Sequence, residues 1–385
     1  MQATACVYFI QAENALIRTE IQMSLDEEIK IARQQIVKDG YDMSVGELMS
    51  LYKEQELIIS PAFQRYFRWD EGQKTKFIES LLLGIPIPPI FVFQTDEGTW
   101  ELVDGLQRLS TLFELAGILT DSDGKRMHPS ILQGTKKLPS LADQSWENGL
   151  TKVQQFDIKR ARIRVEILGK GTNPYTKFEL FQRLNESGSI LTEQEIRTCS
   201  MVMVNDAFYH WIVKLSKSEP FLAMTAQTKE AQNKQTPIEL TLRFLIHRQI
   251  PYQSGLNVHD YLNDGMLRLA DSYPGDEKVD FRLEEKIFFN TFSWLNDTIG
   301  EEVFKRWYRN EKRFKGKFLV SAYQTIAVGV SKHLDTITQI ENQKEWMLNQ
   351  IDRLWENNLY SKYLTSGTQG AMQLAKLLPK DFFRP

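Results

Sequence analysis

A strand, a glycine turn and an arginine follow one another in WELVDGLQRLSTLF, residues 100–113, and this combination suits a phosphate group. An apolar, β-rich run ends at Asp104-Gly105, and a helical pattern starts directly afterwards. Gly105 permits a sharp turn because glycine tolerates positive φ. The free N–H groups and the positive dipole end of a helix start favour anions. Arg108, beside Gln107 in that first turn, is the strongest single candidate for a phosphate contact.

Three roles are open to Asp104: it can bind Mg²⁺, orient a water molecule, or cap the helix that follows. The sequence contains no Walker loop, HExxH, paired CxxC or GxSxG motif. Any hydrolysis would therefore depend on Asp104, Gln107 and Arg108 as the catalytic set, with Mg²⁺ as the expected metal.

A second polar segment precedes this motif. Gln64, Arg65, Arg68 and Trp69 lie between a predicted strand and a capped helix. The arginine fork matches phosphate oxygens, and Trp69 or Phe67 can stack on a base. The alternative is that the aromatic side chains are core and the arginines are solvated. We expect Gln64, Arg65 and Trp69 to contact the ligand.

A third segment contains Asn185, Ser187 and Gly188 in a predicted turn between two helices. A glycine there lets backbone N–H groups point at an anion. On the next helix, Glu195 either completes a capping box or binds Mg²⁺, and both roles stay open. We expect Asn185 and Arg197 to face the ligand.

Three stretches, ISPAFQRYFRWDEGQKTKFIESLLLGIPIPPIFVF, ELVDGLQRLSTL and FQRLNESGSILTEQEIR, occur in this order. In order and spacing they resemble the GmrSD-type N-terminal domain of restriction and phage-defence proteins, over approximately residues 40–200. The family motif reads DGQQR, and here Leu106 stands in place of its first glutamine. The resemblance implies a ParB/sulfiredoxin-like fold that binds a nucleotide and often hydrolyses it.

The resemblance and the pattern together predict an α+β fold in which an all-α region follows the N-terminal domain. The expected parts are an N-terminal helical extension (1–40), a ParB/sulfiredoxin-like nucleotide-binding domain (41–200) and a helical domain (201–385). Larger relatives add a C-terminal HNH-type nuclease. We expect none here, because the five histidines are scattered along the sequence.

The predicted function is that of a nucleotide-binding subunit of a restriction or phage-defence system, able to hydrolyse a nucleoside triphosphate and gate a partner nuclease. The alternative is a DNA-binding or adaptor protein with an inactive nucleotide site. Expected cofactors are a nucleoside triphosphate and Mg²⁺; a nucleotide, DNA and a separate nuclease subunit are the candidate partners. The sequence leaves the oligomeric state open.

Composition agrees with a globular protein. The 385 residues are 42% hydrophobic and 25% charged, with a net charge of −3. Only two cysteines argue against a disulfide framework. No run reaches the roughly 20 apolar residues of a transmembrane helix. We therefore expect a cytoplasmic protein without membrane contact.

Local patterns predict the elements that position these residues. Capping boxes predict helices that begin after Ser24 and Ser44, the first of them ending at Gly40, and Asp70 is predicted to cap a third helix. Alternation predicts strands, and the stretch 120–157 is expected to be mostly loop. The predicted strands are 57–59, 90–95, 99–103 and 161–168, and helical spacing dominates after residue 174.

One basic segment, KRWYRNEKRFKGKF at 305–318, mixes cations with aromatic residues. Lys305, Arg306, Arg309 and Arg313 could bind a nucleic-acid backbone while the rings stack on bases. The alternative, which we favour, is an amphipathic helix with its aromatic side chains inward and its basic side chains in water.

Overall fold

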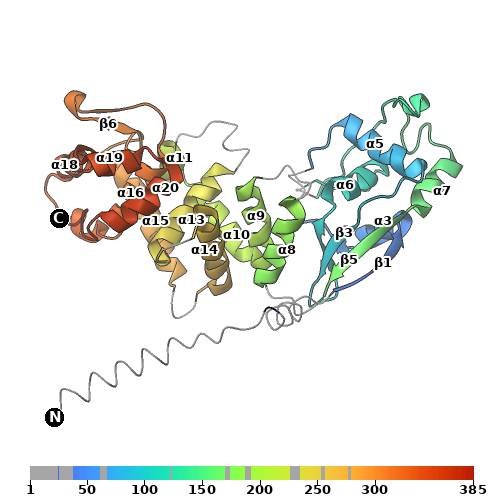
Figure 1. The fold of residues 1–385 in the computed structure, drawn as a ribbon, viewed down its shortest axis with the longest axis horizontal. Helices are drawn as coiled ribbons and strands as arrows, with labels where there is room; N and C mark the ends of the chain where they lie inside the picture. The colour runs from blue at the N-terminus through green and yellow to red at the C-terminus, as the bar shows by residue number, and fades with distance from the viewer. Residues whose placement is uncertain are drawn as a thin grey trace, which may run out of the picture. The chain divides into compact units, whose positions relative to one another are not determined.

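The computed structural model divides into two compact units, Met1–Lys177 and Phe178–Pro385 (Figure 1). It describes residues 25, 38–60, 67–121, 124–169, 174–186, 192–225, 235–252, 256–275 and 279–385. The first unit contains a mixed sheet with helices, and the second is mainly helical, so the predicted α+β class is confirmed. Among the described residues, no helix combines the length and apolar character needed to cross a membrane.

The sheet of the first unit has five strands in the order β1-β5-β3-β4-β2. β3 pairs in parallel with β5 and antiparallel with β4, which places the end of β4 next to the start of β3. Antiparallel β1–β5 and parallel β2–β4 pairs complete it. The bounds are β1 (Lys38–Ser44), β2 (Leu57–Ile58), β3 (Ile90–Gln94), β4 (Trp100–Asp104) and β5 (Arg162–Leu168).

The described part of this unit includes the helices α3 (Val45–Lys53), α5 (Glu71–Leu82), α6 (Leu106–Leu115) and α7 (Lys152–Arg160). Two of the predicted caps are confirmed. The Ser44 hydroxyl accepts from the Glu47 N–H at the start of α3. Asp70 and Gln73 form a reciprocal capping box at the start of α5. α5 packs against α6 and α7, and α3 packs against α7.

One of the sequence predictions for this unit is wrong. Gly40 does not end a helix, because it lies in β1 opposite Glu166 of β5; the rest of the predicted helix, apart from Leu25, lies outside the described residues up to Lys38. Most described residues of the stretch 120–157 lie outside helices and strands, as predicted, and α7 begins near its end at Lys152. A capping box of Thr151 and Gln154 starts that helix, and it outweighs the polar composition.

In the residues of the second unit that the structure describes, the regular elements are helices and one short hairpin (Figure 1). α8 spans the boundary between the units. The helices are α8 (Pro174–Glu186), α9 (Glu193–Val204), α10 (Asp206–Ser216), α11 (Glu219–Thr225), α13 (Thr236–Gln249), α14 (Val258–Ser272), α15 (Phe281–Thr298), α16 (Val320–Ser331), α17 (Leu334–Ile337), α18 (Gln343–Glu356), α19 (Asn358–Leu364) and α20 (Gly367–Leu377).

The basic segment is the hairpin, so the favoured amphipathic helix is wrong there. β6 (Arg306–Tyr308) and β7 (Arg313–Lys315) pair antiparallel, and the 3₁₀ turn η2 (Arg309–Glu311) joins them. Lys312 follows with φ 48°, a left-handed conformation that closes the turn. Along Arg306–Tyr308 the side chains are exposed, buried and exposed in turn, which is the period of a strand and not of a helix.

Aromatic rings fill the core of the second unit. Phe221, Phe244, Phe288 and Phe292 are fully buried, and their ring centroids lie 4.6–5.4 Å apart in five contacts. Most of these contacts are tilted or edge-to-face, which are the favoured geometries for aromatic pairs. The cluster joins α11, α13 and α15.

Replacing Phe288 by alanine should lower the free energy of unfolding of this unit by about 3–5 kcal/mol, because a buried ring leaves a cavity. Phe289→Ala is the matched control, because Phe289 lies on the same helix but is only half-buried. That substitution should lower the free energy of unfolding less than Phe288→Ala does. Chemical denaturation followed by circular dichroism measures both variants. Equal losses for the two variants would contradict the described core.

Candidate functional site

The start of α6 presents backbone N–H groups without a side-chain cap. Its N-cap residue is Gly105, with φ 108°, so the predicted glycine turn is confirmed. The cap role considered for Asp104 is therefore wrong, because Asp104 is the last residue of β4 and precedes the cap. The dipole of the helix favours an anion at its first backbone N–H groups.

A β-bulge lies immediately before this turn. Phe91 pairs with Asp104 and Val92 pairs with Leu102, so Val103 is an extra residue on β4. Bulges re-aim side chains and occur often beside functional sites. Here the bulge sets the direction of the Asp104 side chain, which is 31% exposed.

Asp104 and Arg108 form an ion pair across the turn. Arg108 Nη2 donates to Asp104 Oδ2 at 2.6 Å. Arg108 Nη1 donates to the carbonyl oxygens of Pro88 and Pro89 at 2.5 and 2.9 Å. The guanidinium thus joins the carboxylate at the end of β4 to the proline segment before β3. Its 13% exposure is much lower than that of Asp104, so Arg108 holds the carboxylate in place.

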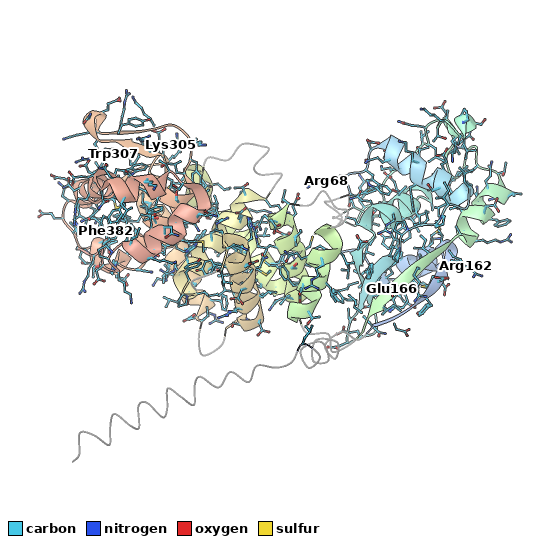
Figure 2. The ribbon with its side chains drawn as sticks, in the orientation of Figure 1. Arg68, Arg162, Glu166, Lys305, Trp307 and Phe382 are labelled. Carbon is cyan, nitrogen blue, oxygen red and sulfur yellow. The ribbon has the colours of Figure 1, made fainter. Side chains whose placement is uncertain are left out.

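Gln107 joins the two N-terminal motifs. Its Oε1 accepts hydrogen bonds from the backbone N–H groups of Arg68 and Trp69, at 3.0 and 3.1 Å. Arg68 itself is exposed (Figure 2). The first and central motifs therefore meet at Arg68, Trp69 and Gln107. Gln64 and Arg65 lie outside the described residues, and their ligand contacts stay predictions.

Trp69 is half-buried and its ring meets that of Phe77 edge-to-face at 5.7 Å. Phe67 is also half-buried and lies beneath the Lys74 ammonium. Both rings thus pack partly against α5, as the core alternative expected, and neither is fully buried. Base stacking by Trp69 stays a prediction.

The sequence patterns missed a buried ion pair between α5 and α6. Lys74 Nζ lies 2.7 Å from Glu114 Oε2 and 2.9 Å from Glu71 Oε1, and 4.7 Å from the ring centroid of Phe67. Burial acts to lower the pKa of Lys74, but the ion pairs with Glu114 and Glu71 raise it above its ordinary value. One sequence signal could have indicated that Lys74 lies on the buried side of its helix. Lys74 is four residues before Ile78 and therefore shares its helical face.

The third motif lies partly outside the described residues. Ser187 and Gly188 belong to 187–191, and of Asn185 only the backbone, within α8, is described. Glu195 completes the predicted capping box: its Oε2 accepts from the Thr192 N–H at 2.7 Å. The capping role is thus confirmed, and metal binding by Glu195 stays a prediction.

Arg197 is buried in the second unit, with 1% exposure. Its Nε donates to Gln194 Oε1 at 3.1 Å, and its Nη1 donates to Asn263 Oδ1 at 3.2 Å. Burial lowers the pKa of Arg197 to about 10, which still leaves it charged at neutral pH. These bonds tie α9 to α14; the predicted contact of Arg197 with a nucleotide is untested.

Among the residues that the structure describes, no three His, Cys, Asp or Glu side chains gather in a way that could hold a metal ion. Mg²⁺ is commonly held by one or two carboxylates together with substrate phosphates. The partly exposed Asp104 carboxylate therefore fits a magnesium ion that a nucleotide brings with it.

Comparison with protein families places this site in a known class. Residues 45–202 match the family model described as GmrSD restriction endonuclease, N-terminal domain. That stretch of the chain is therefore a domain of this family, as its motifs predicted. The comparisons with curated proteins and with solved structures gave no significant match.

Replacing Gly105 by alanine should destabilise the first unit. The added Cβ would lie 2.5 Å from Ile90 Cγ2, and φ is 108°. The free energy of unfolding should fall by about 1–2 kcal/mol because alanine disfavours this positive φ. Overpacking against Ile90 should lower it by about 1–3 kcal/mol more. Gly98→Ala is the matched control, since Gly98 has φ 94° but nothing within 4 Å. Equal losses in urea denaturation would refute the close contact with β3.

Replacing Gln107 by leucine should free the segment that contains Arg68 and Trp69. Two backbone donors lose their acceptor, at an expected cost of about 1–2 kcal/mol. Hydrogen exchange of peptides that span 67–70 should become faster. Gln107→Glu keeps an acceptor at the same position and should retain slow exchange; fast exchange in that variant too would show that the bond is dispensable.

Proposed function

We propose that this protein binds a nucleoside triphosphate with Mg²⁺ at the start of α6, as a subunit of a restriction or phage-defence system. Hydrolysis of that nucleotide would gate a partner nuclease. The proposal includes a ParB/sulfiredoxin-like fold for residues 41–200. The matched family supports the system-level role, since its described member is a restriction endonuclease domain.

The single observation that carries the proposal is the bond from Gln107 to the N–H groups of Arg68 and Trp69. These hydrogen bonds bring the backbone of Arg68 and Trp69 to the uncapped N-terminus of α6. Gln64 and Arg65 are four and three residues before Arg68, so they are close enough in the chain to reach an anion there. A phosphate at this position would meet helix N–H groups and arginine donors together.

Each residue of the central motif has a separate task in this proposal. Asp104 holds the magnesium ion or orients the attacking water. Arg108 is a positioning residue, because its donors bind Asp104 and the carbonyls of Pro88 and Pro89. Gln107 holds the first motif in place. A bound Mg²⁺ would neutralise phosphate charge during transfer.

Replacing Asp104 by asparagine should abolish the dependence of nucleotide binding on Mg²⁺ and slow phosphate release by about 10²-fold or more, the scale of a lost acid–base group. Binding without Mg²⁺ should persist, because the helix N–H groups remain. Calorimetric titration with each nucleoside triphosphate, with and without Mg²⁺, and a phosphate-release assay measure these effects. Asp157→Asn, an exposed carboxylate on α7, is the matched control.

No heat with any nucleoside triphosphate, on folded wild-type protein, would refute nucleotide binding and leave the alternative of a DNA-binding or adaptor protein. Binding without phosphate release would refute hydrolysis alone. If Asp104→Asn released phosphate at the wild-type rate, Asp104 would have no catalytic part.

A further inference from the structure

The β6–β7 hairpin carries a strong positive charge outside the region that the family model matches. Residues 305–317 contain seven basic residues and one acidic residue, Glu311, whereas the whole chain has a net charge of −3. Figure 2 shows Lys305 and Trp307 on this hairpin, and α18 packs against β6 and η2. The charge is therefore concentrated on one small element.

The inner face of the hairpin is anchored to the helices. Trp307 is 6% exposed and its ring contacts that of Phe314, the cross-strand partner, at 4.8 Å. The indole N–H of Trp307 donates to Asp352 Oδ1 of α18 at 2.9 Å. Because side chains alternate along a strand, this anchoring directs the flanking residues outward.

The outer face places cations around one exposed ring. Arg306 is paired with Lys315, and Tyr308 with Arg313, across the two strands. Tyr308 is 38% exposed; the Arg306 guanidinium carbon lies 5.3 Å and Lys315 Nζ 5.4 Å from its ring centroid. Like charges directly opposite each other destabilise a hairpin, and an anionic partner would relieve that repulsion.

Some of the basic residues are occupied by acidic neighbours. Arg309 binds Asp352 and Glu356 at 2.9 and 3.0 Å, so it fastens the hairpin to α18. Lys305 pairs with Glu302 at 2.7 Å. Neither is then a good candidate for a ligand contact, although both belong to the set that the sequence suggested.

The remaining basic residues are poorly balanced. Glu311 alone pairs with both Arg313 and Lys315, each at 2.5 Å. Among the described residues, Arg306 and Lys312 form no ion pair, and both are exposed. The outer face thus has an excess of positive charge on both strands and at the turn.

We propose that this outer face binds duplex DNA through its phosphate backbone, with Arg306, Lys312, Arg313 and Lys315 as the contacts. A two-stranded ribbon fits the major groove, whose walls present phosphates on both sides. The exposed Tyr308 ring among cations suits a sugar or base better than an acidic protein surface. This surface is distinct from the nucleotide site and does not depend on it.

The test uses the full chain and a fluorescently labelled DNA duplex of about two helical turns. Fluorescence anisotropy at several salt concentrations gives the affinity and its salt dependence. The triple variant Arg306→Gln, Lys312→Gln, Arg313→Gln should bind at least about tenfold more weakly. The slope of log affinity against log salt concentration should be smaller in magnitude by about 2–3, because each phosphate contact contributes about 0.9 to that slope.

A matched control variant neutralises Lys217, Lys286 and Lys344, which are exposed and lie away from the hairpin in the sequence. It has the same net charge as the triple variant and should bind DNA as the wild type does. The single variant Lys312→Gln, at the exposed turn, should give a shallower slope by about 0.9 if the triple variant fails to fold.

Four outcomes would overturn the proposal. These are no binding of the duplex by the wild type at low salt, unchanged binding by the hairpin variants, equal weakening by the control variant, and competition by an acidic polypeptide as effective as by DNA. If single-stranded DNA bound more tightly than the duplex, and Tyr308→Ala removed that binding, duplex DNA would be the wrong ligand. The Tyr308 ring would then be assigned to base stacking.

Discussion

One side-chain oxygen, Gln107 Oε1, accepts from two successive backbone N–H groups, those of Arg68 and Trp69. These groups are separated from Gln107 by nearly forty positions, and β3 and β4 intervene between them. A side-chain amide oxygen has two lone pairs, so it can satisfy both donors at once. The segment before α5 is thereby held against the start of α6, and the proposed nucleotide site depends on that attachment.

The second constraint on the site is the group of hydrogen bonds that the Arg108 guanidinium donates. Arginine presents its donors in a rigid fork, so one guanidinium can reach a carboxylate and two carbonyl groups together. The three acceptors come from Pro88, Pro89 and Asp104, on either side of the β3–β4 pair. A phosphate contact by Arg108 would have to compete with these bonds, whereas Asp104 keeps an exposed carboxylate. The chemistry of the site therefore rests more on Asp104 than the charge of Arg108 suggested.

Much of the first unit could be predicted because its signals are local. Capping at Ser44 and Asp70, alternation in β5 and the turn between β3 and β4 each depend on neighbouring residues, and each was found. Gly40 was misplaced because its strand exists only through pairing with β5, which follows more than a hundred residues later. The Lys74–Glu114 pair is also a contact between separate helices, so the local pattern can place Lys74 on the face of Ile78 but cannot indicate its partner.

The hairpin shows a different limit. Its strands have three residues each, too short for alternation to prevail over a helical interpretation of a mixed basic and aromatic segment. The anchoring bond of Trp307 to Asp352 and the pairing of Arg309 with α18 are non-local, and they determine which side chains face outward. The composition alone indicated a nucleic-acid contact but could not separate anchoring cations from exposed ones.

Leu106 is the one departure from the family motif, and its position explains what that departure changes. It is half-buried at the first position of α6, beside Gly105, while Gln107 carries the bond between the motifs. The substitution removes a polar side chain at the helix start without removing the bond that assembles the site. An anion at a helix N-terminus is held by backbone N–H groups, which leucine supplies as well as glutamine does. In the proposed function, the departure would therefore bear on hydrolysis, where a side-chain amide can orient water, more than on binding of the proposed nucleotide.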